Sequence, residues 1–178
     1  MYSAAENEIS LGKDELIITK TDIQGKITYA NRVFMRVANY SEQDLLGHDH
    51  NIIRHPDMPR GVFYGLWKTL KSGSEFFGFI KNYTADKNYY WVFANVTPDY
   101  LNHKVAGFFS VRRYAPGQAK DEMIDIYRQM LEQERAVDRS RAPEASWLWM
   151  NEFIQSEYQM GYEEFVLRLY DKHQRGGE

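Results

Sequence analysis

The chain has 178 residues, a formal net charge of −3, 43% hydrophobic residues and 15% aromatic residues. This is enough for one globular domain plus an appendage, and the weak negative charge excludes the basic footprint of a nucleic-acid-binding protein. The absence of cysteine excludes disulfides, thiolate-held iron–sulfur clusters, cysteine nucleophiles, cysteine-ligated haem and photosensors that work by a cysteine–flavin adduct.

Neither a membrane span nor a secretion signal is expected from the sequence. No apolar run approaches the roughly 20 residues that cross a bilayer. The segment Met1–Asp14 lacks the basic and apolar regions of a signal peptide. We therefore expect a cytoplasmic protein without direct membrane insertion.

The N-terminal third predicts a hairpin followed by short helices. Two strands over 16–21 and 26–29 flank a turn in which Gly25 is free to take a positive φ. Asn31 is placed to cap a helix that ends near residue 39. Ser41 begins a second, short helix, which Gly47 ends.

The middle of the chain predicts one longer helix and three strands. Val62, Phe63, Leu66, Trp67 and Leu70 repeat at helical spacing, which indicates a helix over 59–71 with Trp67 on its buried stripe. Strand-like runs follow over 75–83, 88–97 and 105–114. The expected fold class is α+β, with a five-stranded antiparallel sheet and helices on one face.

Pro116-Gly117 marks the start of a helical tail. Helices are expected over 119–137, 144–158 and 162–172. The expected organisation is an N-terminal cap segment (1–15), a sensory domain (16–115) and a helical extension (116–178). The tail's apolar stripes suit either a dimer interface or packing on its own chain.

Both faces of the predicted sheet are substantially apolar, since alternate residues of each strand are hydrophobic on either side. The helices between residues 31 and 71 cover only one face. The other face therefore needs the N-terminal segment, the tail or a second protomer.

The segment His50–Pro59, with sequence HNIIRHPDMP, concentrates ionisable residues ahead of an aromatic-rich helix. Such groups are rarely buried unpaired, so the segment is a candidate for a ligand-facing wall.

Together with TDIQGKITYAN at 21–31, Leu66-Trp67, Lys81-Asn82 and Tyr90-Trp91-Val92, this segment resembles the PAS sensory domains of the FAD-binding type found in aerotaxis and energy-taxis sensors. The resemblance covers about 16–114. The whole chain looks most like the stand-alone cytoplasmic PAS partner of two-part energy-taxis systems. It implies a PAS fold, bound FAD, a chemoreceptor-like signalling transducer as partner, and location at the inner membrane face through that partner.

The resemblance implies cofactor contacts in the polar segment, each with a structural alternative. Arg54 binds a phosphate or ring carbonyl, or forms an ion pair with Asp57. His55 binds the flavin or ribityl chain, or has a backbone partner. Asp57 holds that histidine or a ribose hydroxyl, and also suits the N-cap of the following helix. His50 and Asn51 contact the ligand, or Asn51 caps a turn.

Further expected contacts lie on the helix and the sheet. Trp67 stacks on the flavin or belongs to the core. Asn82 shares a strand face with Phe76, Gly78 and Ile80, so its amide points into an apolar interior unless it caps the hairpin. Phe76 stands where family members often have Trp. Gly78 either lets the flavin ring approach the sheet closely or marks a bulge in the strand. Asn31 is expected to be structural first.

The function expected is therefore redox or energy-taxis sensing by a dimeric flavoprotein without enzymatic turnover. The alternatives are a cofactor-free PAS interaction module and, less favoured, a haem-based gas sensor.

Overall fold

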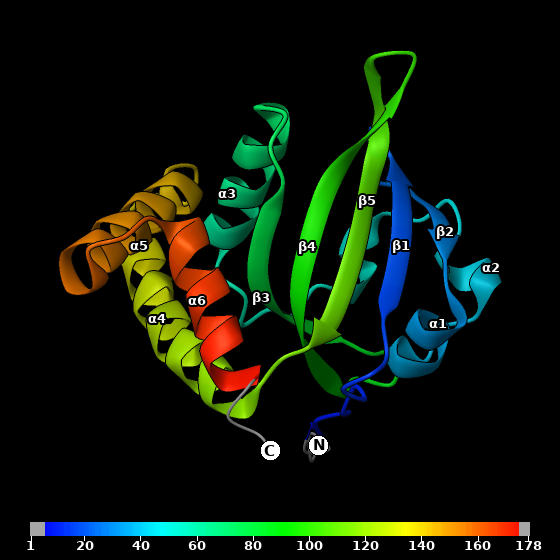
Figure 1. Cartoon of the computed structure of the whole chain (residues 1–178), viewed down its shortest axis with the longest axis horizontal. Helices are drawn as coiled ribbons and strands as arrows, with labels where there is room; N and C mark the ends of the chain where they lie inside the picture. The colour runs from blue at the N-terminus through cyan, green and yellow to red at the C-terminus, as the bar shows by residue number, and fades with distance from the viewer. Residues whose placement is uncertain (1–5, 175–178) are drawn as a thin grey trace. The chain divides into compact units, whose positions relative to one another are not determined.

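The computed structural model describes residues 6–174, which form a five-stranded sheet and a set of helices (Figure 1). The strand order is β2-β1-β5-β4-β3. The strands are β1 (Ile17–Asp22), β2 (Ile27–Ala30), β3 (Phe76–Tyr83), β4 (Tyr89–Leu101) and β5 (Lys104–Tyr114). The helices are α1 (Arg32–Ala38), α2 (Glu42–Leu45), the 3-10 helix η1 (His50–Ile53), α3 (Arg60–Lys71), α4 (Gly117–Arg135), α5 (Ala142–Tyr158) and α6 (Tyr162–Gln174).

The sheet confirms the predicted α+β class. Strand β1 pairs antiparallel with both β2 and β5, and β5 pairs antiparallel with β4. The β4–β5 hairpin turns through Asn102 and His103, which have φ values of 51° and 62°. Strand β4 continues to Leu101, four residues beyond the expected end.

Local capping signals in the N-terminal third act as predicted. Asn31 caps α1, because its Oδ1 accepts from the backbone N–H of Phe34 at 3.0 Å. Ser41 and Asp44 form a reciprocal capping box at α2. Gly25 takes a φ of 85° in the β1–β2 turn. Asn31 and Ser41 therefore fix where the first two helices begin.

The chain divides into two compact units that are not contiguous in sequence. The first unit contains the residues up to His55 and Ile80–Tyr114, and the second contains Pro56–Phe79 and the residues from Ala115 on. In the first unit, Tyr89 binds the N-terminal segment, donating to the Asn7 carbonyl and accepting from the Ile9 N–H.

The second unit is built around the approach of α5 to α3. A Cβ atom added at Gly65 would lie 2.4 Å from the Trp147 ring, and one at Gly61 would lie 2.2 Å from Ser146 Oγ. Two residues without side chains therefore let α5 approach α3 more closely than any larger residue allows. The tail packs on an earlier helix of its own chain.

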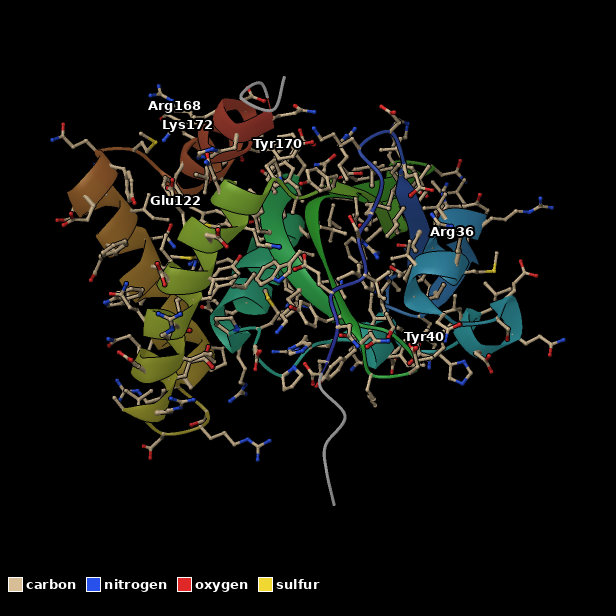
Figure 2. All side chains as sticks on the ribbon, turned by 90° about the horizontal axis from the view of Figure 1, so that it is seen from below. Arg36, Tyr40, Glu122, Arg168, Tyr170 and Lys172 are labelled. Atoms are coloured by element: carbon tan, nitrogen blue, oxygen red, sulfur yellow. The ribbon has the colours of Figure 1, made fainter. Side chains whose placement is uncertain are left out.

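Polar contacts also hold the helices of the second unit together. Glu134 Oε1 of α4 accepts from the Gly61 N–H at 2.9 Å and from Ser146 Oγ at 2.7 Å. At the other end of α4, a Glu122 carboxylate oxygen lies 3.5 Å from His173 Nε2 of α6. Figure 2 labels Glu122 together with residues of α6.

Two expectations about α3 are wrong. Its N-cap is Pro59, without a side-chain cap, so Asp57 is not the cap residue. Trp67 is 40% exposed instead of lying on the buried stripe. The buried face of α3 is shifted toward Gly61 and Gly65, because the close approach of α5 occurs there.

Candidate functional site

A buried polar cluster lies on one face of the sheet in the first unit. Thr19 of β1 stands opposite Ser110 of β5, and Arg112 follows Ser110 on the same face. Arg112 donates from Nε to Ser110 Oγ at 3.0 Å and from Nη2 to Thr19 Oγ1 at 2.6 Å. The guanidinium is thus held in a fixed orientation although the residue is only 4% exposed.

The 3-10 helix η1 adds His50 to this cluster. Arg112 Nη2 donates to His50 Nε2, which also lies 3.2 Å from Thr19 Oγ1. Burial and the neighbouring positive charge of Arg112 lower the pKa of His50 to about 3. The imidazole is therefore neutral at pH 7, and the bond from Arg112 assigns the proton to Nδ1.

The Phe34 ring of α1 covers the cluster from the helical side. Its plane is stacked on the His50 ring at a centroid distance of 6.1 Å. The Arg112 guanidinium carbon lies 5.3 Å from the same ring centroid. An aromatic face offers partial compensation for a buried cation.

Two atoms of this region have no hydrogen-bond partner in the described part of the chain: Arg112 Nη1 and the Tyr90 hydroxyl. Both are buried, and no described carboxylate pairs with Arg112. Burial lowers the pKa of Arg112 and raises that of Tyr90. A contact between the two side chains partly opposes both shifts, since it lowers the pKa of Tyr90 and raises that of Arg112. An unsatisfied buried donor costs about 1–3 kcal/mol, and more when it is charged.

Four other expected site residues belong to the first unit. His55 is buried, and its Nε2 lies 3.2 Å from a Glu6 carboxylate oxygen. Asn82 is also buried, and Arg54 forms an isolated antiparallel bridge with it. Arg54 and Asn51 are exposed. The fold therefore brings Arg54 and Asn82 together although 27 residues separate them in the sequence.

Glu6 gives His55 a side-chain partner that the sequence alone did not indicate. Its other carboxylate oxygen accepts from the Tyr83 hydroxyl at 2.5 Å. The bonds from Tyr83 and from His55 lower the pKa of the Glu6 carboxyl. The His55 and Tyr83 rings are also in contact, with centroids 4.1 Å apart.

Other expected residues belong to the second unit. Phe76 is buried and stacks on Tyr162 of α6 at a centroid distance of 5.7 Å. Gly78 lies under the same tyrosine, since a Cβ atom there would be 2.7 Å from its hydroxyl. Asp57 is exposed. The N-terminal half of β3 is therefore in contact with the C-terminal tail.

Asn31 has the structural role expected of it. Besides capping α1, its Oδ1 accepts from the Ile18 N–H at 3.1 Å, and its Nδ2 donates to the Leu16 carbonyl at 2.8 Å. These bonds attach the start of α1 to β1.

Sequence reasoning missed Arg112, Tyr90 and Thr19 as candidate site residues. A usable signal was present, because alternation along β5 places Arg112 on the same face as Ser110 in an otherwise apolar sheet. A charged residue at such a position needs a partner. Its partners come from β1 and η1, which the local pattern does not reveal.

Residues 6–174 contain neither a metal-ligating cluster nor a membrane-spanning helix. No group of three or more His, Cys, Asp or Glu residues is placed to hold a metal ion. None of the helices in that range is both long and apolar enough to cross a membrane.

Comparison with known proteins identifies the domain. Residues 27–111 match the family model described as the PAS fold. The chain is 37% identical to the Aerotaxis receptor of Escherichia coli (strain K12) over 118 residues, which are 66% of this chain and 23% of the receptor. It is 32% identical to the Nitrogen fixation regulatory protein of Klebsiella pneumoniae over 81 residues, which are 46% of this chain and 16% of that protein.

A solved structure supports the same fold. The light-state structure of the blue-light photoreceptor Aureochrome1 LOV matches with a TM-score of 0.55 and 17% identity, covering 64% of this chain and 90% of that one. Residues 27–111 therefore form a PAS domain, and the chain is similar to part of the Aerotaxis receptor. It spans less than a quarter of the length of the two curated relatives.

Proposed function

We propose that this PAS-domain protein binds a flavin, specifically FAD, and relays its redox state to a chemotaxis-type signalling partner. One observation carries the proposal: the buried Arg112 guanidinium leaves Nη1 without a partner in the described residues, beside the equally unpaired Tyr90 hydroxyl. A ligand with acceptor atoms at this place satisfies both donors.

The chemistry of a flavin fits these donors. Its ring carbonyls, ring nitrogens and phosphates are acceptors, and arginine is the side chain best suited to such groups. Its planar ring suits a pocket with aromatic walls, and Phe34 lies beside the cluster. Similarity to a protein named Aerotaxis receptor supports a redox-linked ligand.

The residues around Arg112 hold its guanidinium in one orientation before a ligand binds. Ser110 and Thr19 accept two bonds from Arg112, so Nη1 is directed without further ordering when the ligand arrives. His50 stays neutral and adds no second positive charge. When bound, the flavin supplies reversible electron transfer. A change in its charge alters its attraction to Arg112, and the sheet that holds Arg112 is the element placed to respond.

The other expected contacts belong to the same proposal. Asn82 contributes its buried amide to the flavin ring. Arg54, which is exposed, suits the phosphate portion. The remaining expected residues keep the cofactor roles that the family resemblance implies: Asn31, His50, Asn51, His55, Asp57, Trp67, Phe76 and Gly78.

The biological role follows from the taxis relative. We infer a sensory segment over 16–115 and a helical extension over 116–178, acting as a homodimer in the cytoplasm. The partner is a chemoreceptor-like transducer, which places the protein at the inner membrane face. Signalling of this kind needs no enzymatic turnover.

The test uses the purified full-length chain and its visible spectrum. We expect flavin absorption, with FAD identified by chromatography after denaturation. Arg112→Met removes the donor and should weaken FAD binding by about 10- to 100-fold, the effect of a hydrogen bond to a charged group. Arg113→Met, at the next position and on the opposite face of β5, is the matched control and should bind normally.

Three results would contradict the proposal. A colourless protein that FAD does not reconstitute indicates the cofactor-free module. A Soret band indicates haem. If wild type and Arg112→Met bind FAD with equal affinity, and circular dichroism shows both to be folded, the assignment of Arg112 to the FAD site is wrong.

A further inference from the structure

Helix α5 of the second unit carries apolar side chains on two sides, and its own unit buries only one of them. The buried residues repeat every fourth position: Ala142, Ser146, Met150 and Ile154. This side faces Gly61 of α3, where a Cβ atom would lie 2.2 Å from Ser146 Oγ. A helix with apolar residues all round is normally buried all round, so the other side of α5 needs a partner.

A second row of residues on α5 lies outside this packing, and we call it the outer row. Its members also repeat every fourth position: Arg141, Ala145, Trp149, Phe153 and Glu157. Trp149 and Phe153 are only half-buried, and their rings stack on each other with centroids 5.2 Å apart. Leu148, next to Trp149, is 48% exposed. The centre of the outer row is therefore an apolar surface available to another molecule.

The two ends of the outer row carry opposite charges. Arg141 is the N-cap residue of α5, and Glu157 is in the last turn, which contains no basic residue. Both are exposed, and neither forms an ion pair within residues 6–174. The helix macrodipole is positive at the N-terminus and negative at the C-terminus, so each charge stands at its less favourable end. A partner with the reverse polarity compensates both.

A second copy of α5, running antiparallel to the first, has this reverse polarity. Trp149 lies eight residues from Arg141 and eight from Glu157. A two-fold axis beside Trp149 therefore places Arg141 of each copy opposite Glu157 of the other. The same axis places the small Ala145 opposite the large Phe153. A uniformly basic partner would match Glu157 but repel Arg141, so the charge pattern favours a second copy of this chain.

We propose that the outer row of α5 is the dimer interface of this protein, with the α5 helices of two copies packed antiparallel around Trp149. This rests on the homodimer of the proposed function, specifies its contact surface and uses no residue assigned to the cofactor. The aromatic centre supplies binding energy, and the two pairs of Arg141 with Glu157 fix the direction of the helices. The C-terminal extension thereby joins two copies of the chain.

The first experiment measures the monomer–dimer equilibrium of the full-length chain, as purified, by sedimentation equilibrium. Trp149→Ala truncates the central ring and should weaken dimerisation at least about 30-fold, as for a central interface residue. Tyr29→Ala truncates an exposed ring of β2 in the other unit. It is the matched control and should dimerise like wild type. Circular dichroism verifies that each variant is folded.

A charge swap tests the antiparallel arrangement. Arg141→Glu and Glu157→Arg each place like charges opposite one another twice in a dimer, and each should weaken dimerisation about 10-fold. The double variant restores opposite charges and should dimerise within about 3-fold of wild type. Arg32→Glu, at an exposed position that begins α1, is the charge control and should leave the equilibrium unchanged.

The outcomes separate this inference from the proposed function. A wild type that stays monomeric at all accessible concentrations overturns this inference and the proposed homodimer, whereas the visible spectrum judges FAD binding independently. A dimer that Trp149→Ala leaves unchanged uses another surface, which overturns this inference alone. It is also overturned if the double charge variant dimerises as weakly as the single variants. A colourless wild type with the expected pattern of dimerisation rejects the flavin and supports this interface.

Discussion

The neutral, half-buried His50 makes the stability of this protein depend on pH in a defined window. Its pKa is about 3 in the folded chain and 6.5 in the unfolded chain. Between these values the unfolded chain binds one proton more than the folded chain, so stability falls as the pH is lowered. The stabilising contribution is complete above pH 6.5 and decreases below it.

The size of the effect follows from the unfolded pKa. Lowering the pH from 7 to 5 removes about 2 kcal/mol of the free energy of unfolding, and the limiting slope is about 1.4 kcal/mol per pH unit. The carboxyl groups of Glu6, Glu15, Asp44 and Asp86 have pKa values lowered from 4.5 or 3.8. Their contributions are lost at still lower pH, and comparison with a His50 variant separates the part due to His50 from that of other groups such as the buried His55.

The perturbation is His50→Gln, which removes the titrating group and keeps an acceptor for Arg112. Urea unfolding of the flavin-free wild type and variant is followed by circular dichroism at pH 7, 6 and 5. We expect the wild type to lose about 2 kcal/mol more than the variant between pH 7 and pH 5. His48→Gln, on the exposed loop before η1, is the control and should follow the wild type.

An equal loss of stability in wild type and His50→Gln would refute this reasoning. It would mean that the His50 ring takes up its proton in the folded state without cost. The interpretation of His50 as a neutral hydrogen-bond acceptor for Arg112 would then be wrong.

Three further changes test the packing by urea unfolding. Asn31→Ala removes a helix cap and should cost at least about 1 kcal/mol; an unchanged midpoint would contradict the role of the cap. Gly65→Ala forces a Cβ atom into the Trp147 ring and should cost about 1–3 kcal/mol. Its control is Gly161→Ala, which has open space around it and should be neutral or stabilising. Equal effects of the two substitutions would refute the close approach of α5 to α3. Glu134→Ala removes the acceptor of the Gly61 N–H and the shorter of two hydrogen bonds of Ser146, and should cost about 1–3 kcal/mol; wild-type stability would argue against that contact.

Local signals in the sequence determined the elements of this fold. Asn31 begins α1 and Ser41 begins α2, because a side-chain oxygen at those positions accepts the first free N–H groups of each helix. Gly25 permits the β1–β2 turn, since its φ of 85° is accessible to glycine. Strand alternation indicated the five-stranded sheet. These features depend on residues a few positions apart, which one sequence displays directly.

Only the tertiary structure decided which distant residues meet. The Arg112 cluster combines β1, η1 and β5, and His55 finds Glu6 across 49 positions of sequence. The buried stripe of α3 was misjudged at Trp67 because hydrophobic periodicity carries no information about the two glycines that admit α5. The sequence by itself determined which helices and strands form and how the first two helices are capped. The pairing of buried polar atoms, and which of them remain available to a ligand, depends on long-range contacts that local preferences do not encode.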